Sequence, residues 1–329
     1  MPNTLTITET IVSYLDSVKL SRSENTARTY KNAMRSFALS LENHGFSPNE
    51  EYIAALDEDF IAQFAADLKI FAPTTERLYL TAATGYYEFL AAERLCEVIL
   101  PRLRMLIKRR ARQPGQRLPQ FPKEDIQSVL HYAERLHEMP SENVRQRLRL
   151  LRDRAFIITL AHTGLRVHEA CNLRRGDVDW HEGKAIIVGK GDREAIVRFS
   201  SRALGVLRDY LTARAELDGA FGRPLTSLPL YARHDRGAGD RVEPISTTTG
   251  RDIVRQRVRE SLGEKAEGTI TPHSFRHYFV TEVLHGTGGN IKLAQRLARH
   301  KNIQVTQRYA HFSDDELDKG YWEVFEGSE

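Results

Sequence analysis

The chain has 329 residues, of which 41% are hydrophobic and 28% charged, and its mean hydropathy is -0.46. These values exclude a disordered chain and a membrane protein, and they are typical of a globular protein long enough for two domains. The formal net charge is only +4, but 11 of the 48 basic residues are lysine, so 48 − 11 = 37 are arginine. Because the planar guanidinium matches phosphate oxygens, this composition favours a polyanionic partner, and a genome rich in G and C, which raises arginine use everywhere, is the alternative.

Residues 5–95 show helical periodicity and no strand pattern. Apolar side chains recur at helical spacing from Ile7 to Val18 and again from Tyr30 to Leu41. A third helix is predicted over residues 57–69, and Pro73 marks the start of a fourth. We therefore expect an N-terminal helical domain over residues 1–108.

Residues 101–117 differ in character, because they are strongly basic and contain no acid. Proline and glycine interrupt the end of this segment, so we predict a linker over residues 109–120. A linker that follows a phosphate backbone would have this composition, and a solvated hinge is the alternative. The candidate DNA contacts are Arg102, Arg104, Lys108, Arg109, Arg110 and Arg112.

Residues 121–329 are predicted to be helical except for one short region. Helices are expected near 123–138, 142–162, 202–217, 246–262, 272–285, 290–299, 302–309 and 313–326. Between them, residues 177–200 contain short β-branched runs separated by glycine-containing turns, which predict a three-stranded antiparallel meander. The expected fold class is mainly α with a small antiparallel β-sheet.

Two short motifs in this part of the chain place a cation at a turn. Thr163-Gly164 ends a predicted helix, and Arg166 starts the next with Glu169 one turn further on. Gly189-Lys190-Gly191 forms a turn between two predicted strands. Each motif taken alone is more often a surface ion pair or an ordinary turn.

Two further motifs place histidine, arginine and tyrosine on helices. His273 and Arg276 lie one turn apart at a helix start, where Thr271 and Pro272 suit the cap and the first position. Such a helix end carries free backbone donors that suit a phosphate group. His300 ends a predicted helix, and Tyr309 follows nine residues later. A single helical tyrosine usually serves in packing.

The order and combination of these motifs resemble the catalytic set of the tyrosine recombinase (phage integrase) family, in its Xer-like two-domain form. The motifs T-G-L-R-x-x-E, H-x-F-R-H and L-x-R-H…Y-x-H span residues 163–311. The N-terminal helices are similar to the family's SAM-like core-binding domain, so that residues 121–329 would form the catalytic domain. The implied catalytic residues are Arg166, Lys190, His273, Arg276, His300 and Tyr309. Family members often have glycine before the last histidine, where this chain has Arg299.

The resemblance implies site-specific DNA recombination through a 3′-phosphotyrosyl intermediate and a Holliday junction. Tyr309 would be the nucleophile, and Arg166 and Arg276 would bind the non-bridging phosphate oxygens. Lys190 would protonate the leaving oxygen, His273 would assist proton transfer and His300 would hydrogen-bond the phosphate. We expect no metal or nucleotide cofactor, because the sequence has neither an acidic cluster for Mg²⁺ nor a glycine-rich phosphate loop.

The expected partner is double-stranded DNA, bound by a homotetramer or by a heterotetramer with a related recombinase. The acidic, amphipathic segment 313–329 would dock on a neighbouring subunit, or fold on its own domain. No signal peptide or membrane span is predicted, so the expected location is the cytoplasm, at the nucleoid. Two alternative functions are type IB topoisomerase-like strand relaxation and DNA binding without cleavage. The target sequence and the biological task, whether dimer resolution, integration or transposition, stay open.

Overall fold

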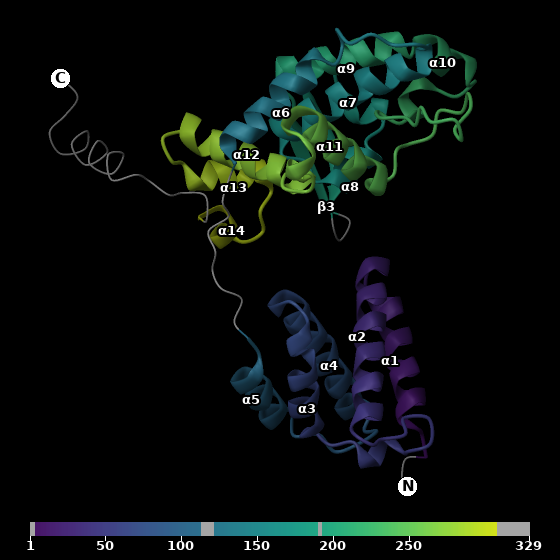
Figure 1. Ribbon diagram of the computed structural model, residues 1–329, viewed down its shortest axis with the longest axis vertical. Helices are drawn as coiled ribbons and strands as arrows, with labels where there is room; N and C mark the ends of the chain where they lie inside the picture. The colour runs from purple at the N-terminus through teal and green to yellow at the C-terminus, as the bar shows by residue number, and fades with distance from the viewer. Residues whose placement is uncertain (1–3, 113–121, 190–192, 308–329) are drawn as a thin grey trace, which may run out of the picture. The chain divides into compact units, whose positions relative to one another are not determined.

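The computed structural model describes residues 4–112, 122–189 and 193–307. The chain divides into two compact units, Met1–Arg117 and Leu118–Glu329 (Figure 1). Each unit has its own hydrophobic core and is described separately.

The regular elements in the described part of the first unit are all helices. Its helices are α1 (Ile7–Ser21), α2 (Glu24–Asn43), α3 (Phe60–Asp67), α4 (Pro73–Ala92) and α5 (Leu100–Arg110), with the short 3₁₀ turns η1 (Ile53–Ala55) and η2 (Leu68–Ile70). Local sequence sets several of the starts. Thr6 and Glu9 form a capping box before α1, the Ser23 hydroxyl caps α2, and Pro73 occupies the first turn of α4.

Aromatic rings form the centre of the first core. The Phe37 ring meets the rings of Phe60, Phe64, Tyr86 and Tyr87 edge to face, with centroids 5.0–6.2 Å apart. This geometry suits the charge distribution of aromatic rings and contributes beyond simple burial.

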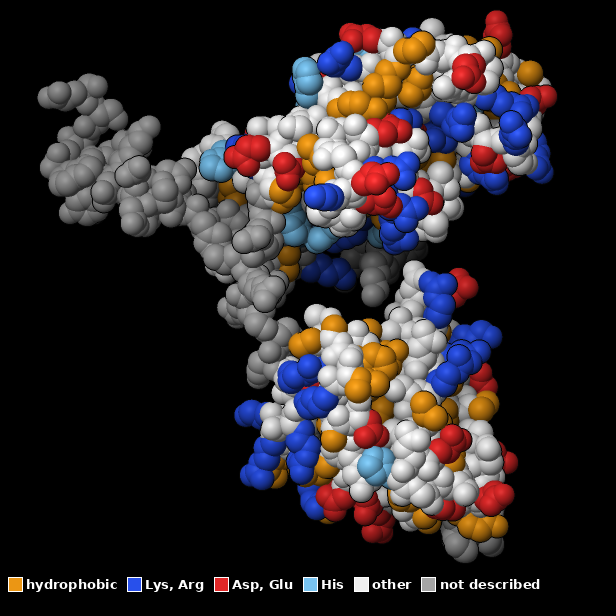
Figure 2. All heavy atoms as spheres, viewed as in Figure 1, with side chains coloured by type: hydrophobic (Ala, Val, Ile, Leu, Met, Phe, Trp, Pro, Cys, Tyr) orange, Lys and Arg blue, Asp and Glu red, His pale blue; other side chains and the backbone are white. Residues whose placement is uncertain are grey.

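Helix α5 contains most of the basic segment. Leu103 is buried, and Arg102 forms ion pairs with Glu58 at 3.0 Å and Asp59 at 2.6 Å. Beyond the helix, Arg112 bonds to the buried carboxylate of Glu76. The helix thus continues into the range 109–120 that the sequence assigns to a linker, while residues 113–120 lie outside the described part. Figure 2 shows Lys and Arg side chains gathered over the position of α5.

The second unit combines helices with one small sheet. Its helices are α6 (Lys123–Arg135), α7 (Val144–Thr163), α8 (Val167–Asn172), α9 (Ser201–Ala213), α10 (Ala215–Ala220), α11 (Thr247–Leu262), α12 (Pro272–Gly286), α13 (Ile291–Ala298) and α14 (Ile303–Gln307). Short 3₁₀ turns occur at η3 (Arg175–Asp177), η4 (Leu225–Ser227) and η5 (Glu264–Ala266).

The sheet contains β1 (Val178–Asp179), β2 (Lys184–Gly189) and β3 (Arg193–Arg198), in the order β1-β2-β3. Both pairings are antiparallel, and Ile186 lies opposite Ile196. The expected meander and the expected fold class, mainly α with a small antiparallel sheet, are therefore confirmed.

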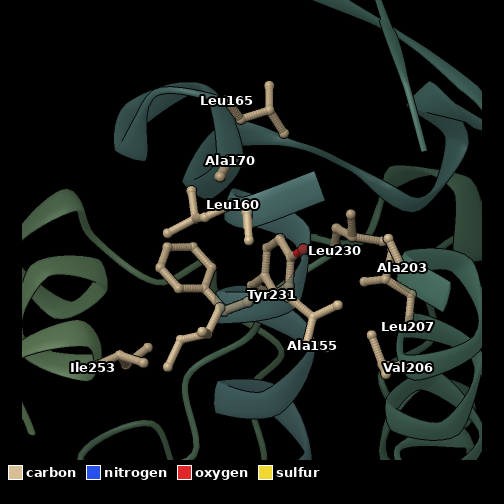
Figure 3. Packing of buried hydrophobic residues seen from close by; sticks show 14 of the residues in the cluster. Ala155, Leu160, Leu165, Ala170, Ala203, Val206, Leu207, Leu230, Tyr231 and Ile253 are labelled. Carbon is tan, nitrogen blue, oxygen red and sulfur yellow. The ribbon is translucent and has the colours of Figure 1, made fainter. Parts of the chain in front are cut away.

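Helix α7 lies at the centre of the second core. Side chains from α9 and α11 meet it around Tyr231, as Figure 3 shows. The Phe156 ring of α7 contacts the Tyr231 ring edge to face, with centroids 5.1 Å apart. This packing fixes α7, and so fixes the turn that follows Thr163.

Within the described ranges, each helix is too short or too polar to cross a bilayer.

Candidate functional site

The turn after α7 depends on glycine. Gly164 caps the helix in the left-handed conformation, with φ +59°, and its N–H donates to the Leu160 carbonyl at 3.2 Å. A Cβ atom at Gly164 would overlap the Phe279 ring, whose Cγ would lie only 2.9 Å away. The close contact places α12 against the end of α7, and Arg166 is then the N-cap of α8.

Arg166 is held by Glu169, one turn further along α8. The Arg166 backbone N–H donates to Glu169 Oε2 at 2.8 Å, and the Arg166 guanidinium donates to Oε1 at 2.8 Å. The Glu169 side chain is 1% exposed and that of Arg166 is 44% exposed. Burial by itself would raise the pKa of Glu169, but the bonds from Arg166 and the charge of Arg299 lower that pKa below its usual value. An ionised carboxylate thus orients a guanidinium that still reaches solvent.

Arg276 links the two ends of the site. It is the fifth residue of α12 and is 2% exposed. Its guanidinium donates to the carbonyl of Gly164, before α8, and to the carbonyl of Ala298, at the end of α13. Arg276 therefore brings together two segments that lie more than 130 residues apart in the chain.

The histidines of the site are neutral at pH 7. Desolvation of the ring, followed by the charges of Arg276 and Arg166, lowers the pKa of His273. The same three causes, with smaller effects of His273 and His277, lower the pKa of His300 to about 4. The pKa of His277 is also about 4, lowered by burial and by its neighbours His273 and Arg276. These shared effects show that Arg166, His273, Arg276 and His300 lie close together.

His300 is held on both sides. Its Nδ1 lies 2.9 Å from the hydroxyl of the buried Thr306, and its backbone carbonyl accepts from the Gln295 side chain at 3.1 Å. The ring orientation is thus fixed by α14 while the backbone is fixed by α13.

Arg299 precedes His300 and joins the same network. Its guanidinium donates to Glu169 Oε2 at 3.1 Å and to the Gly164 carbonyl at 3.3 Å. The sequence marks Arg299 only as a departure from glycine, and it gives no indication of Thr306. Arg299 and Glu169 lie 130 residues apart in the sequence, so no local pattern could predict their contact.

The structure brings four of the six predicted catalytic residues together: Arg166, His273, Arg276 and His300. The other two, Lys190 and Tyr309, lie outside the described residues, as does the segment 313–329. Arginines can bind an anionic phosphodiester, and neutral imidazoles beside them can accept or donate protons at the oxygens that attack or leave the phosphorus. In the described ranges no three metal-binding side chains cluster.

Comparison with known proteins identifies the family of the chain. Residues 121–316 match the model of the phage integrase family. The tyrosine recombinase XerC of Pelobacter propionicus is 35% identical over 171 residues, which cover 52% of this chain and 51% of that protein. The XerC of Bacillus subtilis is 28% identical over 324 residues, covering 98% and 96% respectively.

Solved structures show the same fold. The Tn1549 transposon integrase, in complex with transposon right end DNA, aligns with a TM-score of 0.67 and 16% identity, covering 98% of this chain and all of that one (100%). The family match extends over more than half of the chain and includes the four residues gathered at the site. The chain therefore belongs to the phage integrase family, as a tyrosine-type site-specific recombinase similar to the Xer enzymes.

Proposed function

We propose that the protein cuts and rejoins double-stranded DNA at specific sites through a 3′-phosphotyrosyl link to Tyr309. One observation carries this proposal: Arg166 and Arg276 meet at the Gly164 turn with neutral His273 and His300 beside them. Such a set suits a phosphodiester, which carries one negative charge before the reaction and gains another in the transition state.

The chemistry conserves the energy of the DNA bond. The Tyr309 phenol oxygen attacks phosphorus and the bond to the 5′-oxygen breaks, so one phosphoester replaces another. Lys190 gives a proton to the leaving 5′-oxygen, and neutral His273 helps to remove the phenol proton. A free 5′-hydroxyl from the partner duplex then reverses the step, and the same transfer on both duplexes exchanges one pair of strands and forms a Holliday junction.

The remaining site residues bind the phosphate. Arg166 and Arg276 stabilise the non-bridging oxygens, and preorganised donors of this kind contribute about 10²- to 10³-fold each. If the Thr306 hydroxyl donates to His300 Nδ1, the ring proton lies on Nε2 and can be donated to a phosphate oxygen.

The partner is double-stranded DNA, as the complex of the transposon integrase supports. The first unit is proposed to be a core-binding domain over residues 1–108, followed by a linker over 109–120 and the catalytic domain over 121–329. Strand exchange between two duplexes needs four active sites, so we infer a tetramer on DNA, composed of this chain or of this chain and a related recombinase. The proposed location is the cytoplasm, at the nucleoid.

Covalent trapping tests the reaction. Purified protein is incubated with nicked fragments of the source organism's genomic DNA, and protein-bound fragments that survive denaturant are sequenced. We expect fragments that end at one recurrent site and that vanish with Tyr309→Phe. Adducts that persist in Tyr309→Phe would refute the assignment of the nucleophile, and no adducts with the wild type would refute cleavage itself.

Strand exchange is tested with two mapped duplexes of different lengths. A recombinase produces duplexes of mixed length, whereas an enzyme that only relaxes supercoils restores the original strands. The genomic position of the mapped sites then distinguishes dimer resolution, integration and transposition.

A further inference from the structure

Arg299 has a backbone conformation that normally favours glycine. It ends α13 with φ +57° and ψ +41°, in the left-handed region. Among the described residues, Arg94 is the one other non-glycine residue with positive φ. A side chain that is kept in this conformation needs a compensating interaction.

The Arg299 guanidinium donates to the nearby Leu297 carbonyl at 3.5 Å, and its two other hydrogen bonds are with parts of the site. It donates to Glu169 Oε2 at 3.1 Å and to the Gly164 carbonyl at 3.3 Å. Glu169 in turn holds the guanidinium and the backbone N–H of Arg166, while the Gly164 carbonyl also accepts from Arg276. Arg299 therefore contacts the two groups that hold the two phosphate-binding arginines.

We propose that Arg299 is a positioning residue for strand cleavage, which acts through Glu169 and the Gly164 turn to keep Arg166 in place. This proposal rests on the proposed function. The Arg299 side chain is 11% exposed, whereas that of Arg166 is 44% exposed, so Arg166 reaches the phosphate and Arg299 supports it from behind. A glycine at this position fits the backbone but provides no support for Glu169.

The test compares cleavage with binding on one duplex, the mapped site with a nick that prevents religation. At saturating protein, Arg299→Gly should lower the single-turnover cleavage rate about tenfold, because a small displacement of a phosphate-binding group is costly. Its Kd for the duplex should change less than about twofold, since Arg166 and Arg276 remain. Arg299→Lys should recover much of the rate by restoring a cation beside Glu169.

Arg296→Ala is the matched control. Arg296 lies on the last turn of the same helix, is exposed, and has no acidic partner among the described residues. Its loss removes one positive charge from the same surface, and we expect the cleavage rate to stay unchanged.

A double variant shows whether Arg299 acts through Glu169. Glu169→Gln should slow cleavage, and adding Arg299→Gly to it should slow cleavage little further, because the same support is already removed. Independent, multiplying effects would contradict the proposal. If Arg299 had a purely structural role, its substitution would lower the thermal unfolding temperature, and its effect on the cleavage rate would not depend on Glu169. Arg299→Lys keeps the test valid if Arg299→Gly folds poorly.

Two other results would overturn the inference. Cleavage by Arg299→Gly at the wild-type rate would show that Arg299 does not support the reaction. Weaker DNA binding with an unchanged saturated rate would show that Arg299 binds a phosphate directly. The wild type and Tyr309→Phe on the same duplex separate these results from a failure of the proposed function. If the proposed function fails, the wild type forms no covalent adduct, or Tyr309→Phe still forms one.

Discussion

Two features of the site require glycine at position 164: a left-handed backbone and close packing against Phe279. The Gly164 φ of +59° lies where a side chain costs about 1–2 kcal/mol, and a Cβ atom would also overlap the Phe279 ring. We expect Gly164→Ala to destabilise the second unit by about 2–4 kcal/mol, because overpacking adds to the backbone cost. Urea unfolding followed by tryptophan fluorescence measures this change, since both tryptophans, Trp180 and Trp322, belong to that unit.

Gly205→Ala is the control for this prediction. Gly205 lies within α9, and a Cβ atom there would have no heavy atom within 4 Å. Alanine is favoured over glycine inside a helix, so this change should stabilise the same unit by about 0.5–1 kcal/mol. Equal effects of the two substitutions would show that the Gly164 turn is not under the proposed constraint.

At the scale of single elements, α5 has two classes of cation. Arg102 and Arg104 pair with acids of the same unit, Glu58 and Glu88. Lys108, Arg109 and Arg110 are exposed and form no ion pair with an acid within the described part of the chain. We predict that these three cations bind DNA phosphates, because their charge is not already compensated.

The double change Lys108→Ala and Arg109→Ala should weaken binding to any duplex. It should also reduce the slope of log affinity against log salt by about 2, because each phosphate interaction that is removed lowers the slope by about one. Arg102→Ala should have a smaller effect on the slope and should destabilise the first unit, since Glu58 is buried. Fluorescence anisotropy with a labelled duplex at several salt concentrations measures the affinity and its slope against salt. An unchanged slope would show that α5 does not bind DNA phosphates.

Local signals explain which elements the sequence could predict. Capping residues and apolar spacing indicated α1, α2 and α4, and the short β-branched runs indicated the sheet. The sequence did not predict helix α5, because the acids that compensate its positive charge lie elsewhere in the chain. Glu58, the partner of Arg102, lies 44 residues away. At the site, the motifs selected Arg166, His273, Arg276 and His300, which lie together, while Lys190 and Tyr309 lie outside the described residues. The bonds of Arg276 and Arg299 to Gly164 depend on tertiary packing, so no local pattern could predict them.

At the scale of the whole molecule, the acidic segment 313–329 contains Asp314, Asp315 and Glu316 followed by apolar residues. Negative charge repels DNA, so we propose that this segment binds protein. If it docks on a neighbouring subunit, deleting residues 313–329 should abolish cooperative binding to a pair of sites and leave binding to a half-site nearly unchanged. Gel-shift titration on both duplexes measures this. Unchanged cooperativity would favour docking on the segment's own domain.

The stability of the second unit should depend on pH through its buried histidines. Burial, with the charges of Arg152, Arg214 and Arg149, lowers the pKa of His234 to about 3, and the pKa values of His277 and His300 are about 4. In the unfolded chain these rings bind protons near their ordinary pKa of about 6.5. As the pH falls below 6.5, the unfolded state therefore gains protons that the folded state does not.

The free energy of unfolding should thus fall between about pH 6.5 and about pH 5.5, approaching a slope of about 1.4 kcal/mol per pH unit for each histidine. Carboxylates change little in this window, because they are ionised in both states. Urea unfolding followed by tryptophan fluorescence reports the second unit alone. His234 Nε2 lies 2.7 Å from the Tyr210 hydroxyl, so His234→Gln keeps a polar partner for that hydroxyl. This variant should lower the slope by the contribution of one histidine, which approaches about 1.4 kcal/mol per pH unit. A slope that is the same in His234→Gln would mean that the folded state does not lower the pKa of His234, contrary to the effect expected of burial and of the nearby Arg152 and Arg214.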